Sequence, residues 1–248
     1  MRVIARLDIK NEFVIKGIHL EGLRKVGDPI QLALKYYEQG IDEIVFMDAV
    51  ASLYDRNNLF HVIEEACKQV FVPITIGGGI RSLDDIEKSL HAGADKVAIN
   101  TAAVHNPELI GEAALKYGSQ CVVASIEAKK SPTGWEAYID NGREKTGIDV
   151  VQWVRRLEDL GAGEILLTSV DMEGTKKGFD VDLVEAVCDT TSVPVIVSGG
   201  LGQTKHITNM TERVMPSAIS CAGVLHYDLL TVNEIKTYMN EHSLDVRP

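Results

Sequence analysis

The sequence predicts an α/β fold in the form of a single (βα)₈ TIM barrel that extends over residues 1–248. Three observations carry this prediction: the length of the chain, eight short apolar runs that alternate with helical segments, and an internal duplication. A chain of 248 residues suits one such barrel, and strand–helix alternation indicates a parallel sheet with crossover helices. An open doubly wound sheet is the alternative, but we would not expect it to duplicate so evenly.

The eight expected strands form two sets of four, one in each half of the chain. The first set is Val3–Asp8, Ile44–Asp48, Val72–Ile76 and Lys96–Asn100, and the second is Cys121–Glu127, Glu164–Ser169, Val193–Val197 and Ala218–Ala222. Helix starts are marked by Asp28 before Pro29, Asn106 before Pro107, and the capping pairs Ser82 with Asp85 and Thr231 with Glu234. Gly40 is expected to end the first of these helices. These signals place helices between the strands, as a barrel requires.

The two halves also match each other in sequence. The matching stretches are Ala5–Lys10 with Ala124–Lys129, Gly40–Ile44 with Gly161–Ile165, Gly78-Gly79 with Gly199-Gly200, and Ala98–Val104 with Ala218–Val224. All four pairs are separated by 119 to 121 residues. Because four matches at nearly one offset are not expected by chance, we predict two duplicated half-barrels, approximately residues 1–120 and 121–248.

Composition limits the classes of function. The net charge of −11 argues against a nucleic-acid surface, which needs a basic stripe. The four cysteines contain no C-x-x-C pair and are expected to be reduced, without a disulfide or metal framework. The first residues form a charged strand rather than a signal peptide, and no apolar run approaches about 18 residues. We therefore expect a cytoplasmic protein that binds neither nucleic acid nor a membrane.

Two carboxylates end opposite strands of the expected barrel. Asp8 ends the first strand and Glu127 ends the fifth, and the active site of this fold lies at the carboxyl ends of the strands. Either residue alone would be interpreted as a loop carboxylate or a helix cap. Two carboxylates at equivalent positions of the repeat favour acid–base catalysis on a small molecule.

Glycine-rich stretches end two further strands at symmetric positions. The third and seventh strands end in Gly77–Gly79 and Gly199-Gly200, and the fourth and eighth are followed by Asn100-Thr101 and Ala222-Gly223. Glycine lets backbone N–H groups approach an oxyanion closely, and a short following helix adds its positive end. One Gly-Gly pair is more often only a tight turn, but two symmetric pairs predict two phosphate cradles. We therefore expect a substrate with a phosphate at each end, held by backbone dipoles rather than by net charge.

Four charged residues begin strands at the other end of the expected barrel. They are Arg2, Glu43, Lys96 and Glu164, at the starts of the first, second, fourth and sixth strands. Two positive and two negative side chains around one opening can close as a ring of ion pairs, since an unpaired buried charge is costly. The ring is interpreted either as a charged barrel floor or as a gate.

Longer motifs are shared with a known family. The most specific are LDIK, GDPIQLA, VPITIGGGIRS, GADKVAINTAAV, GAGEILLTS, GTKKGFD and VPVIVSGG. On these motifs the chain resembles, over essentially its whole length, the cyclase subunit of imidazole glycerol phosphate synthase from histidine biosynthesis. The resemblance implies a lyase without cofactor or metal that receives ammonia from a glutaminase subunit in a heterodimer. The ammonia would react with a bis-phosphorylated ribulosyl-formimino aminoimidazole carboxamide, giving imidazole glycerol phosphate and an aminoimidazole carboxamide ribotide.

The resemblance also implies roles for residues of this sequence. Asp8 would be one catalytic acid–base, Glu127 stands where the family has an aspartate, and Lys16 would hold the substrate from a mobile loop. The implied phosphate-binding residues are Gly79, Asn100 and Thr101 at one site and Gly174, Gly200, Ala222 and Gly223 at the other. The implied ammonia gate is the charged ring of Arg2, Glu43, Lys96 and Glu164.

The sequence departs from the family near the expected catalytic face. The departures are Arg6 in place of a cysteine, Glu127 in place of an aspartate, Val50 within Asp48–Ser52, and Met172 and Glu173 within Asp171–Thr175. Arg6 lies two residues before Asp8, so both side chains should point into the barrel. There Arg6 could pair with Asp8 or reach toward Glu127.

Three alternatives to the cyclase remain open at this point. A paralogue could use the same ammonia delivery to convert an acetamido sugar to an acetamidino sugar in O-antigen or other surface-polysaccharide biosynthesis. A related sugar-phosphate isomerase would also use two carboxylates and two phosphate cradles, but it has no use for a gate. A non-catalytic scaffold that only activates a glutaminase would need neither Asp8 nor Glu127. The ammonia-dependent cyclase is the leading hypothesis.

Overall fold

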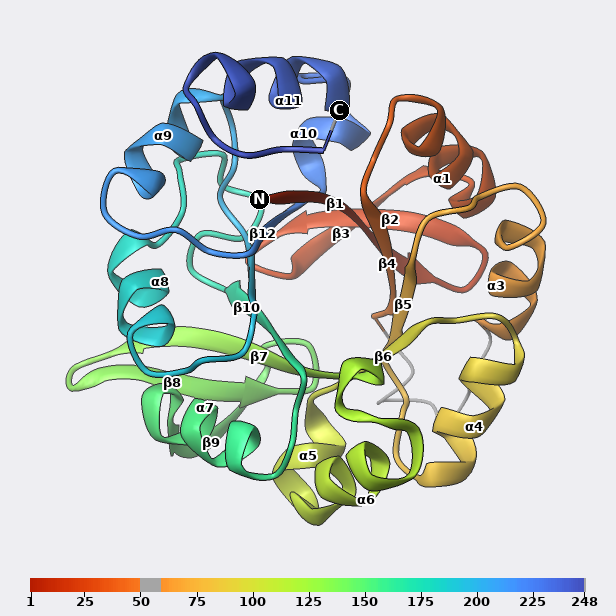
Figure 1. The fold of residues 1–248 in the computed structure, drawn as a ribbon, viewed down its shortest axis with the longest axis vertical. Helices are drawn as coiled ribbons and strands as arrows, with labels where there is room; N and C mark the ends of the chain where they lie inside the picture. Colours follow the sequence, from red (N-terminus) through yellow and green to blue (C-terminus); the bar gives the residue numbers. More distant parts are fainter. Residues whose placement is uncertain (50–58, 248) are drawn as a thin grey trace.

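Eight parallel strands close into a barrel with helices around it (Figure 1) in the computed structural model, which describes residues 1–49 and 59–247. Around the barrel the strands follow the order β1, β4, β5, β6, β7, β10, β11 and β12. Pairing of β12 with β1, and of β7 with β10, closes the circle. The predicted (βα)₈ barrel is therefore confirmed, and the open doubly wound sheet is excluded.

The barrel strands overlap the expected ones. They are β1 (Arg2–Lys10), β4 (Glu43–Asp48), β5 (Ile74–Gly77), β6 (Lys96–Ile99), β7 (Val122–Ser131), β10 (Glu164–Ser169), β11 (Val195–Ser198) and β12 (Ala218–Cys221). Strands β5 and β11 begin two residues later than predicted, after Pro73 and Pro194. A proline has no N–H to donate to a neighbouring strand, so the ladder starts beyond it.

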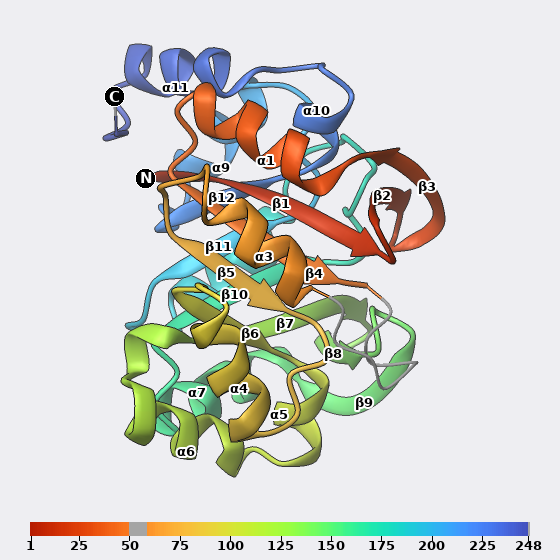
Figure 2. The same cartoon turned by 90° about the vertical axis from the view of Figure 1, so that its right-hand side faces the viewer.

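Helices cover the outside of the barrel (Figures 1 and 2). They are α1 (Pro29–Glu38), α3 (Phe60–Ala66), α4 (Leu83–His91), α5 (Thr101–His105), α6 (Glu108–Tyr117), α7 (Val150–Asp159), α8 (Val181–Cys188), α9 (Lys205–Thr211), α10 (Gly223–His226) and α11 (Val232–Glu241). The predicted caps Asp28, Ser82 and Thr231 each accept hydrogen bonds from first-turn N–H groups. Helix α6 instead has Pro107 at its cap, one residue after the predicted Asn106. None of the helices in residues 1–49 and 59–247 is long and apolar enough to cross a membrane.

Two antiparallel hairpins, which we did not predict, extend the barrel at its carboxyl end. Strands β2 (Phe13–Ile18) and β3 (Glu21–Gly27) continue from β1, while β8 (Gly134–Ile139) and β9 (Glu144–Asp149) continue from β7. Figure 2 shows both hairpins at the same end of the barrel. They therefore lie beside the strand ends that carry Asp8 and Glu127.

The structure corrects the register of one internal match. Strand β6 is followed by Asn100 at the start of α5, and β12 is followed by Ala222 at the start of α10. Lys96 therefore corresponds to Ala218, 122 positions further along, because each is the first residue of its strand. The sequence match of Ala98 with Ala218 was wrong by two residues, since it followed a shared Ala-Ile pair rather than the strand ends.

An apolar layer separates the two ends of the barrel interior. Its members are Ile4, Val45, Met47, Ala98, Val123, Leu166, Ile196 and Ala218, all buried. Strand side chains alternate in direction, so inward-facing positions recur at every second residue. On β1 the inward positions run from Arg2 through Ile4 to Arg6 and Asp8. The charged ring and the carboxylates consequently occupy opposite ends of the same interior.

Candidate active site

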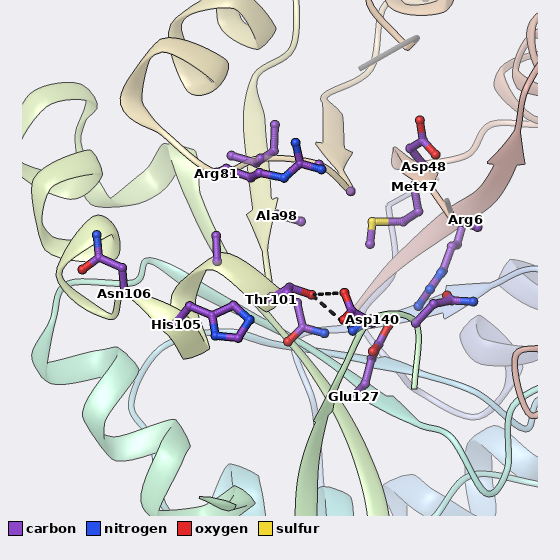
Figure 3. Close-up of a pocket in the computed structure, with 17 residues that line it drawn as sticks. Arg6, Met47, Asp48, Arg81, Ala98, Thr101, His105, Asn106, Glu127 and Asp140 are labelled. Carbon is purple, nitrogen blue, oxygen red and sulfur yellow. Dashed lines mark hydrogen bonds between the residues drawn. The ribbon is translucent and has the colours of Figure 1, made fainter. Parts of the chain in front are cut away.

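Asp8 and Glu127 lie at the mouth of the barrel on opposite strands, β1 and β7. Their exposed fractions are 6% and 5%. Arg6 lies near Glu127 (Figure 3), and its Nε donates to Asp8 Oδ1 at 2.8 Å. Glu127 Oε2 accepts instead from the backbone N–H of Gly142 at 2.8 Å. The structure thus selects the first of the two expected contacts of Arg6, the pair with Asp8.

The Arg6 side chain crosses part of the barrel interior. Its Nη1 donates to Thr168 Oγ1 at 2.8 Å and to Ser198 Oγ at 3.4 Å, which connects β1 with β10 and β11. Only 2% of Arg6 is exposed. A buried guanidinium requires a counter-charge and partners for its N–H groups, and Asp8 with the two hydroxyls supplies them. A cysteine at this position could make none of these contacts.

Lys16 extends this network of buried charges. It lies in strand β2 rather than in the expected loop, because the hairpin with β3 continues the sheet from β1. Its Nζ is 3.4 Å from Asp8 Oδ2 and forms an ion pair with Glu173. The backbone C=O of Glu173 accepts from His19 N at 2.8 Å. Two cations and two carboxylates therefore form one buried cluster, which consists of Arg6, Asp8, Lys16 and Glu173.

The two carboxyl groups have opposite pKa shifts. Burial alone would raise the pKa of Asp8, but the nearby Arg6 and Lys16 outweigh it and lower that pKa to about 2. Burial raises the pKa of Glu127 to about 7, although Arg6 opposes the shift. At neutral pH Asp8 is therefore ionised, while Glu127 can gain and lose a proton. Proton transfer is most efficient when the pKa of the group lies near the working pH.

The pocket beside Glu127, here called the Thr101 pocket, has a volume of about 420 Å³. It brings together the predicted residues Gly79, Asn100 and Thr101 with Arg6 and Glu127 (Figure 3). The turn before it depends on glycine, because a Cβ on Gly78, where φ is 86°, would lie 2.2 Å from the backbone oxygen of Asp48. The first expected cradle therefore forms one pocket with a carboxyl group.

The second pocket, here called the Gly200 pocket, has a volume of about 590 Å³. The residues predicted for the second phosphate line it together, namely Gly174, Gly200, Ala222 and Gly223. Lys16, predicted only to hold the substrate, lines the same pocket. A Cβ on Gly200, where φ is 101°, would lie 1.9 Å from the backbone oxygen of Gly178. Asp8 lines a small cavity with Lys16 and Glu173. Since Lys16 also lines the Gly200 pocket, this cavity adjoins it.

Phosphate is expected to occupy both pockets in crystals soaked with inorganic phosphate. In each, backbone N–H groups beside glycines can approach the anion, which side chains would otherwise prevent. We expect Gly79→Ala to remove the anion from the Thr101 pocket only, and Gly200→Ala to remove it from the Gly200 pocket only. A parent crystal with phosphate in neither pocket would contradict the assignment of the cradles.

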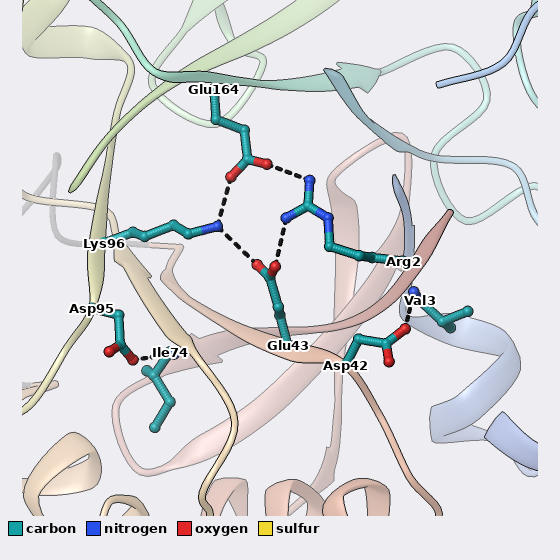
Figure 4. Close-up of polar contacts among 8 residues, drawn as sticks. All are labelled: Arg2, Val3, Asp42, Glu43, Ile74, Asp95, Lys96 and Glu164. Carbon is teal, nitrogen blue, oxygen red and sulfur yellow. Dashed lines mark hydrogen bonds and ion pairs between the residues drawn. The ribbon is translucent and has the colours of Figure 1, made fainter. Parts of the chain in front are cut away.

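The four charged residues at the amino end of the barrel form a closed ring of ion pairs (Figure 4). Arg2 lies 2.5 Å from both Glu43 and Glu164. Lys96 lies 3.0 Å from Glu43 and 2.9 Å from Glu164. Each carboxylate thus bridges both cations, and the ring has no net charge. It lies across the amino end of the interior, opposite the two pockets.

Comparison with known proteins places the chain in a family. Residues 2–231 match a family model described as "Histidine biosynthesis protein". This chain belongs to the histidine biosynthesis protein family. The chain is 61% identical over 204 residues to the imidazole glycerol phosphate synthase subunit HisF of Legionella pneumophila. The alignment covers 82% of this chain and 96% of that protein. The resemblance inferred from the motifs is confirmed.

Three residues in or near the site were not predicted from the sequence. Asp140 and Asn141 line the Thr101 pocket from the turn after β8, and the Asp-Asn-Gly sequence there is a turn signal that could have revealed them. His226 is buried, its Nδ1 lies 2.7 Å from the Tyr36 hydroxyl, and burial with the nearby Lys16 lowers its pKa to about 4. Of the departures, Val50 lies outside the described residues.

Proposed function

We propose that this chain is the ammonia-dependent cyclase subunit of imidazole glycerol phosphate synthase, an enzyme of histidine biosynthesis. The identity of 61% with a HisF subunit supports this function. The structural observation that carries the proposal is the placement of Asp8 and Glu127 between two glycine-rich pockets, with the ion-pair ring at the opposite end of the barrel. A two-phosphate substrate and a separate entrance for a small co-substrate both fit that arrangement.

The substrate would be the bis-phosphorylated ribulosyl-formimino aminoimidazole carboxamide, with one phosphate in each pocket. A glutaminase subunit bound over the ring would supply ammonia, and the two chains would form a heterodimer in the cytosol. Ammonia would meet the substrate between the carboxyl groups. Asp8 stays ionised and stabilises developing positive charge, and Glu127 exchanges protons as the substrate is cleaved and closed to a ring. Imidazole glycerol phosphate, the aminoimidazole carboxamide ribotide and one molecule of water would leave.

The activity is tested by incubating the purified chain with this substrate and an ammonium salt, and following both products. Turnover without a glutaminase is the expected result, because ammonium in solution can reach the open mouth. Within the buried cluster, Arg6 and Glu173 depart from the family pattern and pair with Asp8 and Lys16. These departures favour one second candidate, amidination of an acetamido sugar. If the chain did not turn over the imidazole precursor but still bound phosphate in both pockets, the cyclase reaction would be contradicted. Amidination of an acetamido sugar would then become the leading candidate.

Lys96→Ala is expected to lower glutamine-driven turnover far more than turnover driven by an ammonium salt. The substitution removes the ion pairs of Lys96 with Glu43 and Glu164 and so opens the ring. Asp8 and Glu127 lie at the opposite end of the barrel and keep their contacts. We expect the ratio of the two rates to fall at least about tenfold, or ~1.4 kcal/mol in the barrier of the coupled route. Lys88→Ala, at an exposed helix position, is the matched control. Equal losses in both assays would mean that the ring only stabilises the barrel.

A further inference from the structure

The turn between β8 and β9 has an uncommon backbone. Asp140, Asn141 and Gly142 follow one another with φ values of 52°, 60° and 72°. Glycine adopts positive φ at no steric cost, and asparagine and aspartate are the other residues that tolerate it best. Consecutive residues in this region occur where the surrounding structure holds them, often at binding sites. The conformation therefore depends on the contacts that hold the turn in place.

The turn is attached to two groups of the candidate site. Gly142 N donates to Glu127 Oε2 at 2.8 Å. Asp140 N donates to Thr101 Oγ1 at 3.2 Å, and Thr101 Oγ1 is 3.4 Å from Asp140 Oδ1 (Figure 3). A Cβ on Gly142 would lie 3.1 Å from Leu20 Cδ1, so the turn also packs closely against the β2–β3 hairpin. Its position relative to Glu127 and the Thr101 pocket is consequently fixed.

Asn141, at the centre of the turn, has an amide without a partner. Its Nδ2 is buried and makes no hydrogen bond within residues 1–49 and 59–247. The residue lines both the Thr101 pocket and the small cavity that contains Asp8 and Lys16. A buried donor left unpaired is unfavourable. An acceptor on a bound ligand would satisfy it.

We propose that Asn141 is a substrate-binding residue whose side-chain amide donates a hydrogen bond to a neutral acceptor between the two phosphate groups of the ligand. The acceptor lies in the central part because Asn141 adjoins the cavities of both catalytic carboxyl groups. It is neutral because Arg6 and Lys16, the cations that line these cavities beside Asp8 and Glu173, already pair with those carboxylates. A carbonyl oxygen or an unprotonated ring nitrogen fits this description. The identity of the ligand rests on the proposed function.

Two substitutions test the amide without altering the turn. Asn141→Gly deletes it and keeps positive φ, while Asn141→Asp keeps shape and φ but exchanges the donor for a carboxylate oxygen. We expect Asn141→Gly to weaken binding of the bis-phosphate substrate about tenfold, as loss of one hydrogen bond would, and Asn141→Asp to weaken it more. Inorganic phosphate should bind both pockets as in the parent, because it has no central part. The readouts are calorimetric titrations with each ligand.

Asn11 provides the matched control. It is exposed, has a φ of 57°, and lies in the turn between β1 and β2, so Asn11→Gly and Asn11→Asp should leave substrate affinity unchanged. Parent-like substrate affinity in Asn141→Gly would overturn the proposal. An equal loss of inorganic phosphate binding would also overturn it, because the turn would then act only by shaping the pocket. A parent that binds the substrate without converting it would contradict the cyclase reaction, while the affinity comparison would still decide the role of Asn141.

Discussion

Asp8→Asn is expected to lower turnover by about 10²–10³-fold, the usual contribution of a fixed polar or charged group that stabilises the charge developing in the transition state. The change keeps the size of the side chain but removes the charge that pairs with Arg6 and Lys16. With its pKa lowered to about 2, Asp8 is an anion throughout the neutral range. Initial rates with an ammonium salt measure the loss, and titration with inorganic phosphate shows whether the pockets stay intact.

The control for Asp8→Asn is the same change at an exposed position, Asp84→Asn in helix α4. We expect it to leave turnover and phosphate binding unaltered. If Asp8→Asn retained nearly the parent rate, Asp8 would have no part in the reaction, and Glu127 would remain as the candidate proton-transfer group. If it lost phosphate binding as well, the loss of rate would reflect a disrupted site.

Arg6→Cys is expected to destabilise the fold by ~3–5 kcal/mol, because removing one member of a buried ion pair leaves the other charge uncompensated. Arg6 is almost fully buried, so solvent does not replace it as a partner of Asp8. The variant also leaves Thr168 and Ser198 without the guanidinium. Urea unfolding of parent and variant at neutral pH measures the difference in the free energy of unfolding.

The pH dependence of this difference identifies its cause. The folded-state pKa of Asp8, about 2, lies below the value of ~3.9 of an unfolded chain. The stabilisation of the fold by ionised Asp8 is therefore present above the unfolded-state pKa of Asp8. It is lost as pH falls through the folded-state pKa of that group. We expect the gap between parent and Arg6→Cys to narrow between roughly pH 4 and pH 2. A gap that is constant over this window would mean that packing, rather than the ion pair, is what Arg6 contributes.

The sequence by itself determined which end of the barrel the charged ring, the carboxylates and the glycines occupy, because that depends on which end of its strand a residue stands at. Lys96 begins β6 and Arg2 begins β1, so both had to reach the amino end of the barrel, where they share Glu43 and Glu164. Asp8 had to point inward two residues after Arg6, and the two side chains pair. The glycines of both pockets follow parallel strands, whose carboxyl ends meet at one face.

Only the tertiary structure decided the contacts of hairpins and loops, because their positions do not follow from the barrel strands. Lys16 and Glu173 are 157 residues apart and meet because an unpredicted hairpin folds over the mouth. The pKa of Glu127 depends on burial and on Arg6, which no local pattern encodes. Asn141 lies between the carboxyl groups because a turn with positive φ is held by Glu127 and Thr101. Periodicity fixes which end and which face a side chain occupies, whereas its partners, its burial and hence its charge state arise from packing between distant parts of the chain.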